Sequence, residues 1–136
     1  MTDRAPWIAV LRRAAWAPIG TLLLHRVVVW TGVREQADHL VHGCGGAAAA
    51  YCAFVWCRVF GPRLGAVVAW THYLAAFCVA CTAGLFVELI EFAADVWLGT
   101  HVQTSIRETM LDLVSDVVGA VAALLLVAFG SRRTAR

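Results

Sequence analysis

The chain has 136 residues, of which 61% are hydrophobic and only 15% are charged, and its net charge is +2. Soluble domains carry about 25% charged residues, so this chain cannot cover a water-facing surface and must be a membrane protein. Its weak and scattered positive charge excludes a nucleic-acid partner, and its length fits a single domain over 1–136. The five cysteines lie within apolar runs, which indicates small buried side chains rather than a disulfide framework.

Four apolar stretches approach or exceed the roughly 20 residues that a helix needs to cross a bilayer. They run over about 14–31, 38–60, 64–98 and 107–129. Linkers that contain glycine separate them at 32–36, 61–63 and 99–101. The sequence therefore predicts an all-α membrane protein, a bundle of four transmembrane helices joined by short connections.

Arginine placement predicts the orientation of the bundle, because cytoplasmic loops carry an excess of positive residues. The N-terminal segment, the 61–63 linker and the C-terminal tail fall on one side of a four-span protein. Most arginines lie in or beside these three segments: Arg4, Arg12, Arg13, Arg58, Arg63, Arg132, Arg133 and Arg136. The other two linkers are bordered only by Arg34 and Arg107, each next to a glutamate. We therefore expect both termini in the cytoplasm.

Acidic residues gather at the opposite, outer ends of three spans. Every acid except Asp3 and Glu35 belongs to this group. Its members are Asp38, Glu88, Glu91, Asp95, Glu108, Asp112 and Asp116, with His39 and His42 beside the first of them. Within each span the ionisable residues recur at three or four positions, which places them on one helix face. Charges at that depth normally face a bundle interior or a wet cavity, so the pattern predicts a polar site there.

The candidates for ligand or metal binding are the central members of this group: Asp38, His42, Glu88, Glu91, Asp95, Asp112 and Asp116. His39, His101 and Glu108 lie at its edge. Arg26 lies about 20 Å along the first span from Arg13, at the depth of the acids, so we expect it to be their counter-ion. Carboxylates still outnumber the nearby cations, so either some are protonated or a cation binds.

Several functions fit such a group of residues. The carboxylates can stabilise the bundle through hydrogen bonds between helices. Bundle di-metal sites use carboxylates with Glu-x-x-His pairs, and although that strict pair is absent here, a divalent metal is a candidate cofactor. A membrane lipid is another candidate ligand. Our leading hypothesis is an outward-facing acidic and histidine site that binds an envelope lipid, a polar headgroup or a cation, and no reaction is indicated.

Two alternative functions remain open. The chain can be an accessory subunit of a larger membrane complex, in which the acids pair with arginines of a partner, and a second copy of the chain is a further candidate partner. It can also transport protons or other cations across the membrane. Transport needs a path to the inner side, where His72 is the one titratable group besides cysteine and tyrosine.

Three blocks of the sequence carry a family resemblance. They are an Asp-His-Leu-x-His-Gly helix start at 38–43, an acidic helix end that runs into Leu-Gly-Thr at 88–100, and an Asp-rich helix with a late Gly-Ala at 108–120. Together they resemble the YjdF-like and VanZ-like small bacterial integral membrane proteins. The YjdF-like linker often carries Gln-Gly-Asp, where this chain reads Thr-His-Val-Gln-Thr-Ser. The resemblance implies a protein of the bacterial plasma membrane with an outward-facing polar site. It assigns to that site Asp38, His42, Glu88, Glu91, Asp112 and Asp116.

Overall fold

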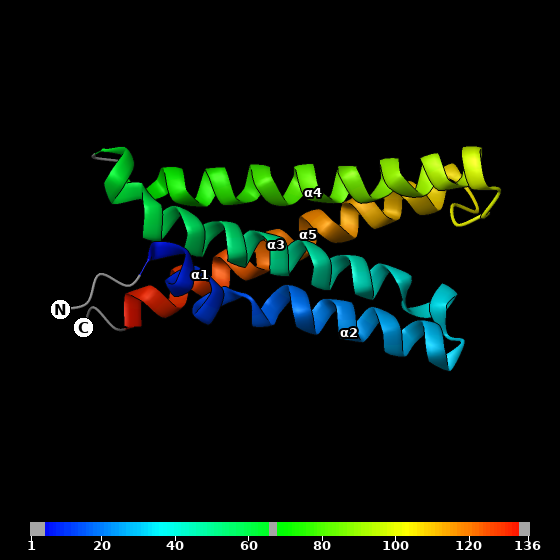
Figure 1. Ribbon diagram of the computed structural model, residues 1–136, viewed down its shortest axis with the longest axis horizontal. Coiled ribbons are helices and arrows are strands. Elements are labelled where there is room, and N and C mark those ends of the chain that lie inside the picture. The colour runs from blue at the N-terminus through cyan, green and yellow to red at the C-terminus, as the bar shows by residue number, and fades with distance from the viewer. Residues whose placement is uncertain (1–4, 66–67, 134–136) are drawn as a thin grey trace.

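The computed structural model consists of α-helices joined by short connections (Figure 1). It describes residues 5–65 and 68–133, except for the side chains of residues 34–36, 64, 132 and 133. The helices are α1 (Pro6–Ala14), α2 (Trp16–Thr31), α3 (Arg34–Leu64), α4 (Ala69–Leu98) and α5 (Ile106–Arg133). No strand occurs within the described ranges, which confirms the predicted all-helical fold.

The central helix of the bundle is α3, because it packs against each of the other four helices described. α4 and α5 also pack against each other, whereas α2 contacts only α1 and α3 among these elements. The start of α1 and the ends of α3 and α5 lie at one end of the molecule, and the start of α3 and the end of α4 lie at the other (Figure 1). Since α2 contacts neither α4 nor α5, a cavity opens on each of its sides, one toward α4 and one toward α5.

The first two helices meet at a bend of 41°. Pro18 explains the position of this bend, because its nitrogen carries no hydrogen and its ring crowds the carbonyl group of Ala14, four residues earlier. The Ala14 carbonyl oxygen instead accepts a hydrogen bond from the Cys52 thiol of α3, with 3.2 Å between Sγ and O. A side chain of the central helix thus replaces the helical bond that proline removes.

A second carbonyl group at the bend also finds partners outside the regular helix pattern. The Arg13 carbonyl oxygen accepts hydrogen bonds from the Trp16 indole, at 3.0 Å, and from the Tyr51 hydroxyl of α3, at 3.2 Å. The two aromatic rings contact each other, with centroids 5.6 Å apart. The bend is therefore held against α3 at two successive carbonyl groups.

Three helices are long and apolar enough to cross a membrane, over Ala37–Arg63, Ala69–Leu98 and Ile106–Ser131. The bent pair of α1 and α2 passes the same test only when it is counted as one span. α2 alone has 16 residues, or about 24 Å at 1.5 Å per residue, which is shorter than the hydrocarbon core of about 30 Å. The predicted count of four spans therefore holds only if α1 and α2 cross together as one broken helix.

The boundary between the second and third predicted spans is shifted. α3 continues through the 61–63 linker, past Pro62, to Leu64, and α4 begins at Ala69. Proline removes only one helical hydrogen bond here, and the Arg63 guanidinium donates to the Val59 carbonyl oxygen at 3.1 Å in the same turn. Gly65 then ends α3 with a φ of 110°.

The positions of the arginines along the helices agree with the arrangement of the helix ends in Figure 1. Arg12 and Arg13 belong to α1, and Arg58 and Arg63 lie in the last two turns of α3. Some of the arginines that indicate the orientation lie outside the described residues: Arg4, Arg136 and the side chains of Arg34, Arg132 and Arg133. The side of the membrane that each end faces stays a prediction.

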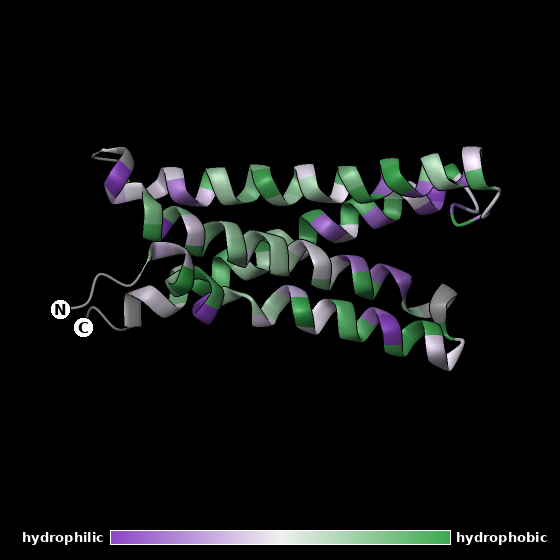
Figure 2. Cartoon of the chain, viewed as in Figure 1, coloured by the Kyte–Doolittle hydropathy of each residue, from purple (hydrophilic) through white to green (hydrophobic). Residues whose placement is uncertain are grey.

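Small side chains let the three longest helices approach closely. The core that joins them consists of Ala50, Ala53, Phe54, Ala76, Ala80, Ala120 and Leu124. Large apolar side chains point outward instead, and Figure 2 shows green, hydrophobic ribbon along most of α4 and α5. Small residues at helix contacts and large apolar residues on the outside are the arrangement expected of a bundle in lipid.

Candidate functional site

Four polar side chains are buried among the described residues, and all four belong to the predicted site. They are His42 of α3, Glu88 of α4, and Asp112 and Asp116 of α5, which are 8%, 4%, 5% and 5% exposed. At 1.5 Å per residue, Glu88 lies about 15 Å from the end of α4 and Asp116 about 15 Å from the start of α5, so their depths agree. Figure 2 shows hydrophilic ribbon on α3, α4 and α5 toward this end of the bundle.

His42 lies between two buried carboxylates from different helices. Its Nδ1 is 3.4 Å from Oδ2 of Asp116 and 3.7 Å from Oε1 of Glu88. One imidazole of α3 therefore connects α4 and α5 inside the bundle.

A second histidine–carboxylate pair lies one turn closer to the start of α3. Nδ1 of His39 is 2.7 Å from Oδ1 of Asp112, and the His39 side chain is 44% exposed. Asp38, His42 and Asp112 can each offer one ligand atom, and these three atoms lie within 4.8 Å of one another. The structure thus brings together residues that belong to separate blocks of the sequence. We call Asp38, His42, Glu88, Asp112 and Asp116 the acidic site.

Glycines provide the space for the Asp116 carboxylate. A Cβ at Gly84 of α4 would overlap Oδ2 of Asp116 and would lie 2.9 Å from its Cγ. A Cβ at Gly45 of α3 would lie 3.7 Å from Oδ1, and one at Gly46 would overlap the Asp116 main chain. Asp116 reaches His42 because side chains are absent at Gly46 and Gly84, whereas the contact at Gly45 is an ordinary one.

Asp95 organises the α4–α5 connection instead of joining the acidic site. Its Oδ1 accepts hydrogen bonds from the Thr100 hydroxyl and the Val102 N–H, both at 2.6 Å. Its Oδ2 accepts a hydrogen bond from the Gln103 N–H at 2.8 Å. The connection therefore folds around one carboxylate at the end of α4.

Gln103 contacts the acidic site although the sequence pattern did not indicate it. Its Nε2 donates to Oε2 of Glu88 and to the Glu88 carbonyl oxygen, both at 3.0 Å. The other carboxylate oxygen, Oε1, is buried and has no hydrogen-bond partner among the described residues. Gln103 lies in a connection, where no helical spacing links it to the acids, so only the fold reveals its role.

A cavity of about 300 Å³ lies beside the acidic site, between α2, α3 and α4. Asp38, His42, Glu91 and Asp116 line it, together with small and apolar residues. Glu91 is half-buried at this cavity. Four of the predicted ligand candidates thus line one cavity.

The second helix presents His25, and not Arg26, to this cavity. Thr21 and His25 are four residues apart and both line it, whereas Arg26 is exposed. No ion pair within 4.0 Å joins Arg26 to another described residue. Adjacent residues point in directions about 100° apart on a helix, so the face that packs on α3 cannot present both. The expected pairing of Arg26 with the carboxylates is therefore not what the structure shows.

The two remaining candidates lie away from the acidic site. His101 is exposed in the α4–α5 connection and lines a separate cavity of about 510 Å³ together with Asp95 and Gln103. Glu108 belongs to the first turn of α5, where its N–H donates to the Ser105 hydroxyl at 3.2 Å. Ser105 therefore caps α5, and Glu108 takes part in starting that helix.

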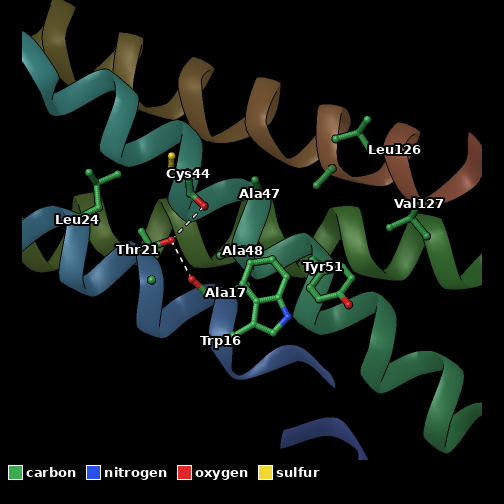
Figure 3. Close-up of a pocket in the computed structure, with 12 residues that line it drawn as sticks. Trp16, Ala17, Thr21, Leu24, Cys44, Ala47, Ala48, Tyr51, Leu126 and Val127 are labelled. Carbon is green, nitrogen blue, oxygen red and sulfur yellow. Dashed lines mark hydrogen bonds between the residues drawn. The ribbon is translucent and has the colours of Figure 1, made fainter. Parts of the chain in front are cut away.

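An apolar groove of about 570 Å³ lies on the other side of α2, between α2, α3 and α5. Figure 3 shows its lining, with Trp16 and Tyr51 close together and Leu126 and Val127 of α5 across from them. Thr21 lines both this groove and the polar cavity. The second helix therefore separates an apolar space from a polar one.

The family described as "Predicted membrane protein (DUF2238)" matches residues 5–133, nearly the whole chain. No curated protein and no solved structure matches the chain. The family description agrees with a membrane protein that contains several apolar helices. The likeness to YjdF-like and VanZ-like proteins stays a prediction from the motifs.

Proposed function

The chain belongs to the DUF2238 family of predicted membrane proteins. We propose that this membrane protein binds a cation at the acidic site. The observation that carries the proposal is a surplus of buried negative charge. Glu88, Asp112 and Asp116 are each more than nine-tenths buried. Their nitrogen partners within 4.0 Å, among the residues described, are the imidazoles of His39 and His42. Three buried carboxylates thus face two imidazoles, even when the half-buried carboxylates nearby are left out.

A bound cation would balance this surplus. A buried charge without a partner is strongly unfavourable, and charged groups inside membranes pair with one another or mark binding sites. Arginine supplies no ion pair to the acidic site in the part of the chain that the structure describes. The cavity beside Asp38 and Asp116 offers the space through which a cation can enter.

Binding fits this bundle better than transport through it. Between the acidic site and the opposite end, the described core is built from alanine, phenylalanine and leucine side chains such as Ala76, Ala80 and Phe54. These buried side chains offer no polar group that could relay a proton or an ion, although Tyr73 packs against them. His72 lies beyond this core, and neither of its ring nitrogens has a hydrogen-bond partner among the described residues.

The arginine distribution supports an outward-facing site in a bacterial plasma membrane. The acidic site lies toward the end opposite to the start of α1 and the end of α5. Arg12, Arg13, Arg58 and Arg63 lie in helix segments at that other end. With the positive end in the cytoplasm, the acidic site lies near the outer surface.

The test is direct cation binding by the chain in lipid nanodiscs, after a chelator has removed bound ions. Calorimetric titration with Mg²⁺, Ca²⁺, Mn²⁺ and Zn²⁺ compares the wild type with Asp112→Asn and Glu108→Gln. We expect at least one ion to bind the wild type, with an affinity about tenfold or more lower in Asp112→Asn. Glu108→Gln is the matched control on the same helix and should bind as the wild type does. The proposal fails if none of these ions binds, or if Asp112→Asn binds equally well.

A lipid with an amine headgroup is a second candidate ligand, favoured by apolar side chains in the lining of the cavity. Leu22, Val41 and Val87 line it together with Asp38, His42 and Asp116. An ammonium group beside the carboxylates would supply the missing positive charge, while a hydrocarbon chain lies against these apolar side chains and the outer surface of the bundle. Mass spectrometry of co-extracted lipids tests this, because an aminolipid should stay with the wild type and be lost from Asp112→Asn. Proteins that co-purify at fixed stoichiometry, with no small ligand, would support the accessory-subunit alternative instead.

A further inference from the structure

We infer that the acidic site is a divalent transition-metal centre in which Asp38, His42 and Asp112 are the ligands. This inference rests on the proposed cation binding and names the class of cation. The candidate ligand atoms of the three residues lie within 4.8 Å of one another. Bonds of about 2.0–2.2 Å to one tetrahedral metal place its ligand atoms about 3.3–3.6 Å apart, so side-chain shifts of about 1 Å complete the site.

In the proposed centre, His42 has the supporting carboxylates that metal-bound histidines usually have. Such histidines donate the ring N–H that does not bind the metal to a carboxylate or another acceptor. Nδ1 of His42 faces Asp116 at 3.4 Å and Glu88 at 3.7 Å, so we assign Nε2 to the metal. Because Gly84 has no side chain, the Asp116 carboxylate has room to lie in this supporting position.

Asp112 has a supporting partner of its own. Nδ1 of His39 lies 2.7 Å from Oδ1 of Asp112, so Oδ2 remains for the metal. Carboxylates that bind metals are commonly held by hydrogen bonds in this way. Two ligands from different helices are therefore already oriented by neighbours that do not bind the metal.

A second observation, on a residue that is not itself a ligand, supports a cation at this place. Glu88 is 4% exposed, and its Oε1 has no hydrogen-bond partner among the described residues, although it lies 3.7 Å from Nδ1 of His42. Leaving a buried carboxylate oxygen unsatisfied is unfavourable. A metal bound to His42 would polarise the imidazole and strengthen its N–H as a donor toward Glu88 and Asp116.

The mixture of ligands indicates the class of metal. Ca²⁺ and Mg²⁺ prefer six or more oxygen ligands, whereas one imidazole with two carboxylates suits Zn²⁺, Mn²⁺, Fe²⁺ or Co²⁺. Three protein ligands also leave an open coordination position. Because Asp38 and His42 line the cavity of about 300 Å³, a water or a polar headgroup in it can complete the coordination.

Co²⁺ is the probe of choice, because its visible absorption reports the coordination geometry. The stripped protein in nanodiscs is titrated with CoCl₂, and the metal bound per chain is measured by mass spectrometry. We expect one Co²⁺ per chain, displaced by Zn²⁺. His42→Gln should lose the visible spectrum, whereas Asp116→Asn, which alters only the support of His42, should keep it with an affinity about 10–100-fold lower. Glu108→Gln should match the wild type.

Monodisperse elution and unchanged tryptophan fluorescence show which variants fold. If His42→Gln does not, Asp38→Asn, at a half-buried ligand, replaces it and should weaken Co²⁺ binding at least about tenfold. A Co²⁺ spectrum that is unchanged in the folded ligand variant would overturn the ligand assignment. Binding of Ca²⁺ without Co²⁺ or Zn²⁺ would overturn the metal class and leave the proposed function intact. If none of these ions binds, both proposals fail.

Discussion

Gly119 of α5 lies so close to Gly43 of α3 that a Cβ at position 119 would overlap the Gly43 carbonyl group. A Cβ at Gly43 would in turn lie 3.5 Å from the Ser115 carbonyl oxygen, which is ordinary contact. The main chains of the two helices therefore meet directly, as small residues permit in membrane bundles. This crossing sets the separation of α3 and α5, and it brings the histidines of α3 to the carboxylates of α5.

Gly119→Ala should destabilise the folded protein by about 1–3 kcal/mol, because the added methyl group meets main chain that moves only if the helices separate. Gly130→Ala on the same helix is the matched control, since a Cβ there meets nothing within 4 Å. Alanine has the higher helix propensity, so the control should keep its stability or gain up to about 1 kcal/mol. Equilibrium unfolding of the reconstituted protein compares the two. Equal stabilities would contradict the close crossing.

The members of the acidic site could be predicted from the sequence better than their contacts. Spacing of four residues placed Asp112 and Asp116 on one face of α5, and a membrane leaves such groups only the bundle interior. Which histidine meets which carboxylate depends on the crossing at Gly43 and Gly119. Periodicity within one helix carries no information about that crossing, so the pairing emerged only from the fold.

Two further features of the site depended on packing that local patterns do not encode. The choice between His25 and Arg26 depended on which face of α2 packs on α3, and the apolar residues around both positions offer no contrast between the faces. Gln103 reaches Glu88 because the Asp95 carboxylate folds the connection back over α4. An isolated glutamine in a linker gives no sign of such a contact.

Gly84→Ala should weaken cation binding without removing a ligand. The added Cβ would overlap Oδ2 of Asp116 and lie 3.1 Å from its Cβ, so the carboxylate must swing away and α4 and α5 must separate slightly. Asp116 then leaves Nδ1 of His42, so we expect about tenfold weaker Co²⁺ binding or more, with a stability loss of about 1–3 kcal/mol. Gly20→Ala, where a Cβ meets nothing within 4 Å, is the control. Unchanged Co²⁺ affinity in Gly84→Ala would show that Asp116 does not orient His42.

Asp95→Asn should loosen the α4–α5 connection. The carboxylate accepts three hydrogen bonds through two oxygens, and an amide retains only one of those oxygens. Hydrogen bonds to charged groups contribute about 1.5–3 kcal/mol each, so amide exchange at Val102 and Gln103 should become about tenfold faster or more. Hydrogen exchange of the reconstituted protein, read by mass spectrometry, measures this. Thr100→Val removes one bond and should have a smaller effect, and equal exchange in all three proteins would refute the role of Asp95.

Both termini should lie in the cytoplasm if α1 and α2 cross the membrane together. The three longest helices alone would place the termini on opposite sides, whereas a fourth, broken span returns them to the same side. Figure 1 supports the second arrangement, because the start of α1 and the end of α5 lie at the same end of the bundle. Fluorescent-protein fusions at either terminus should therefore fluoresce, and alkaline phosphatase fusions there should be inactive. A phosphatase inserted in the α4–α5 connection is the control and should be active, while termini on opposite sides would show that the bent pair does not span.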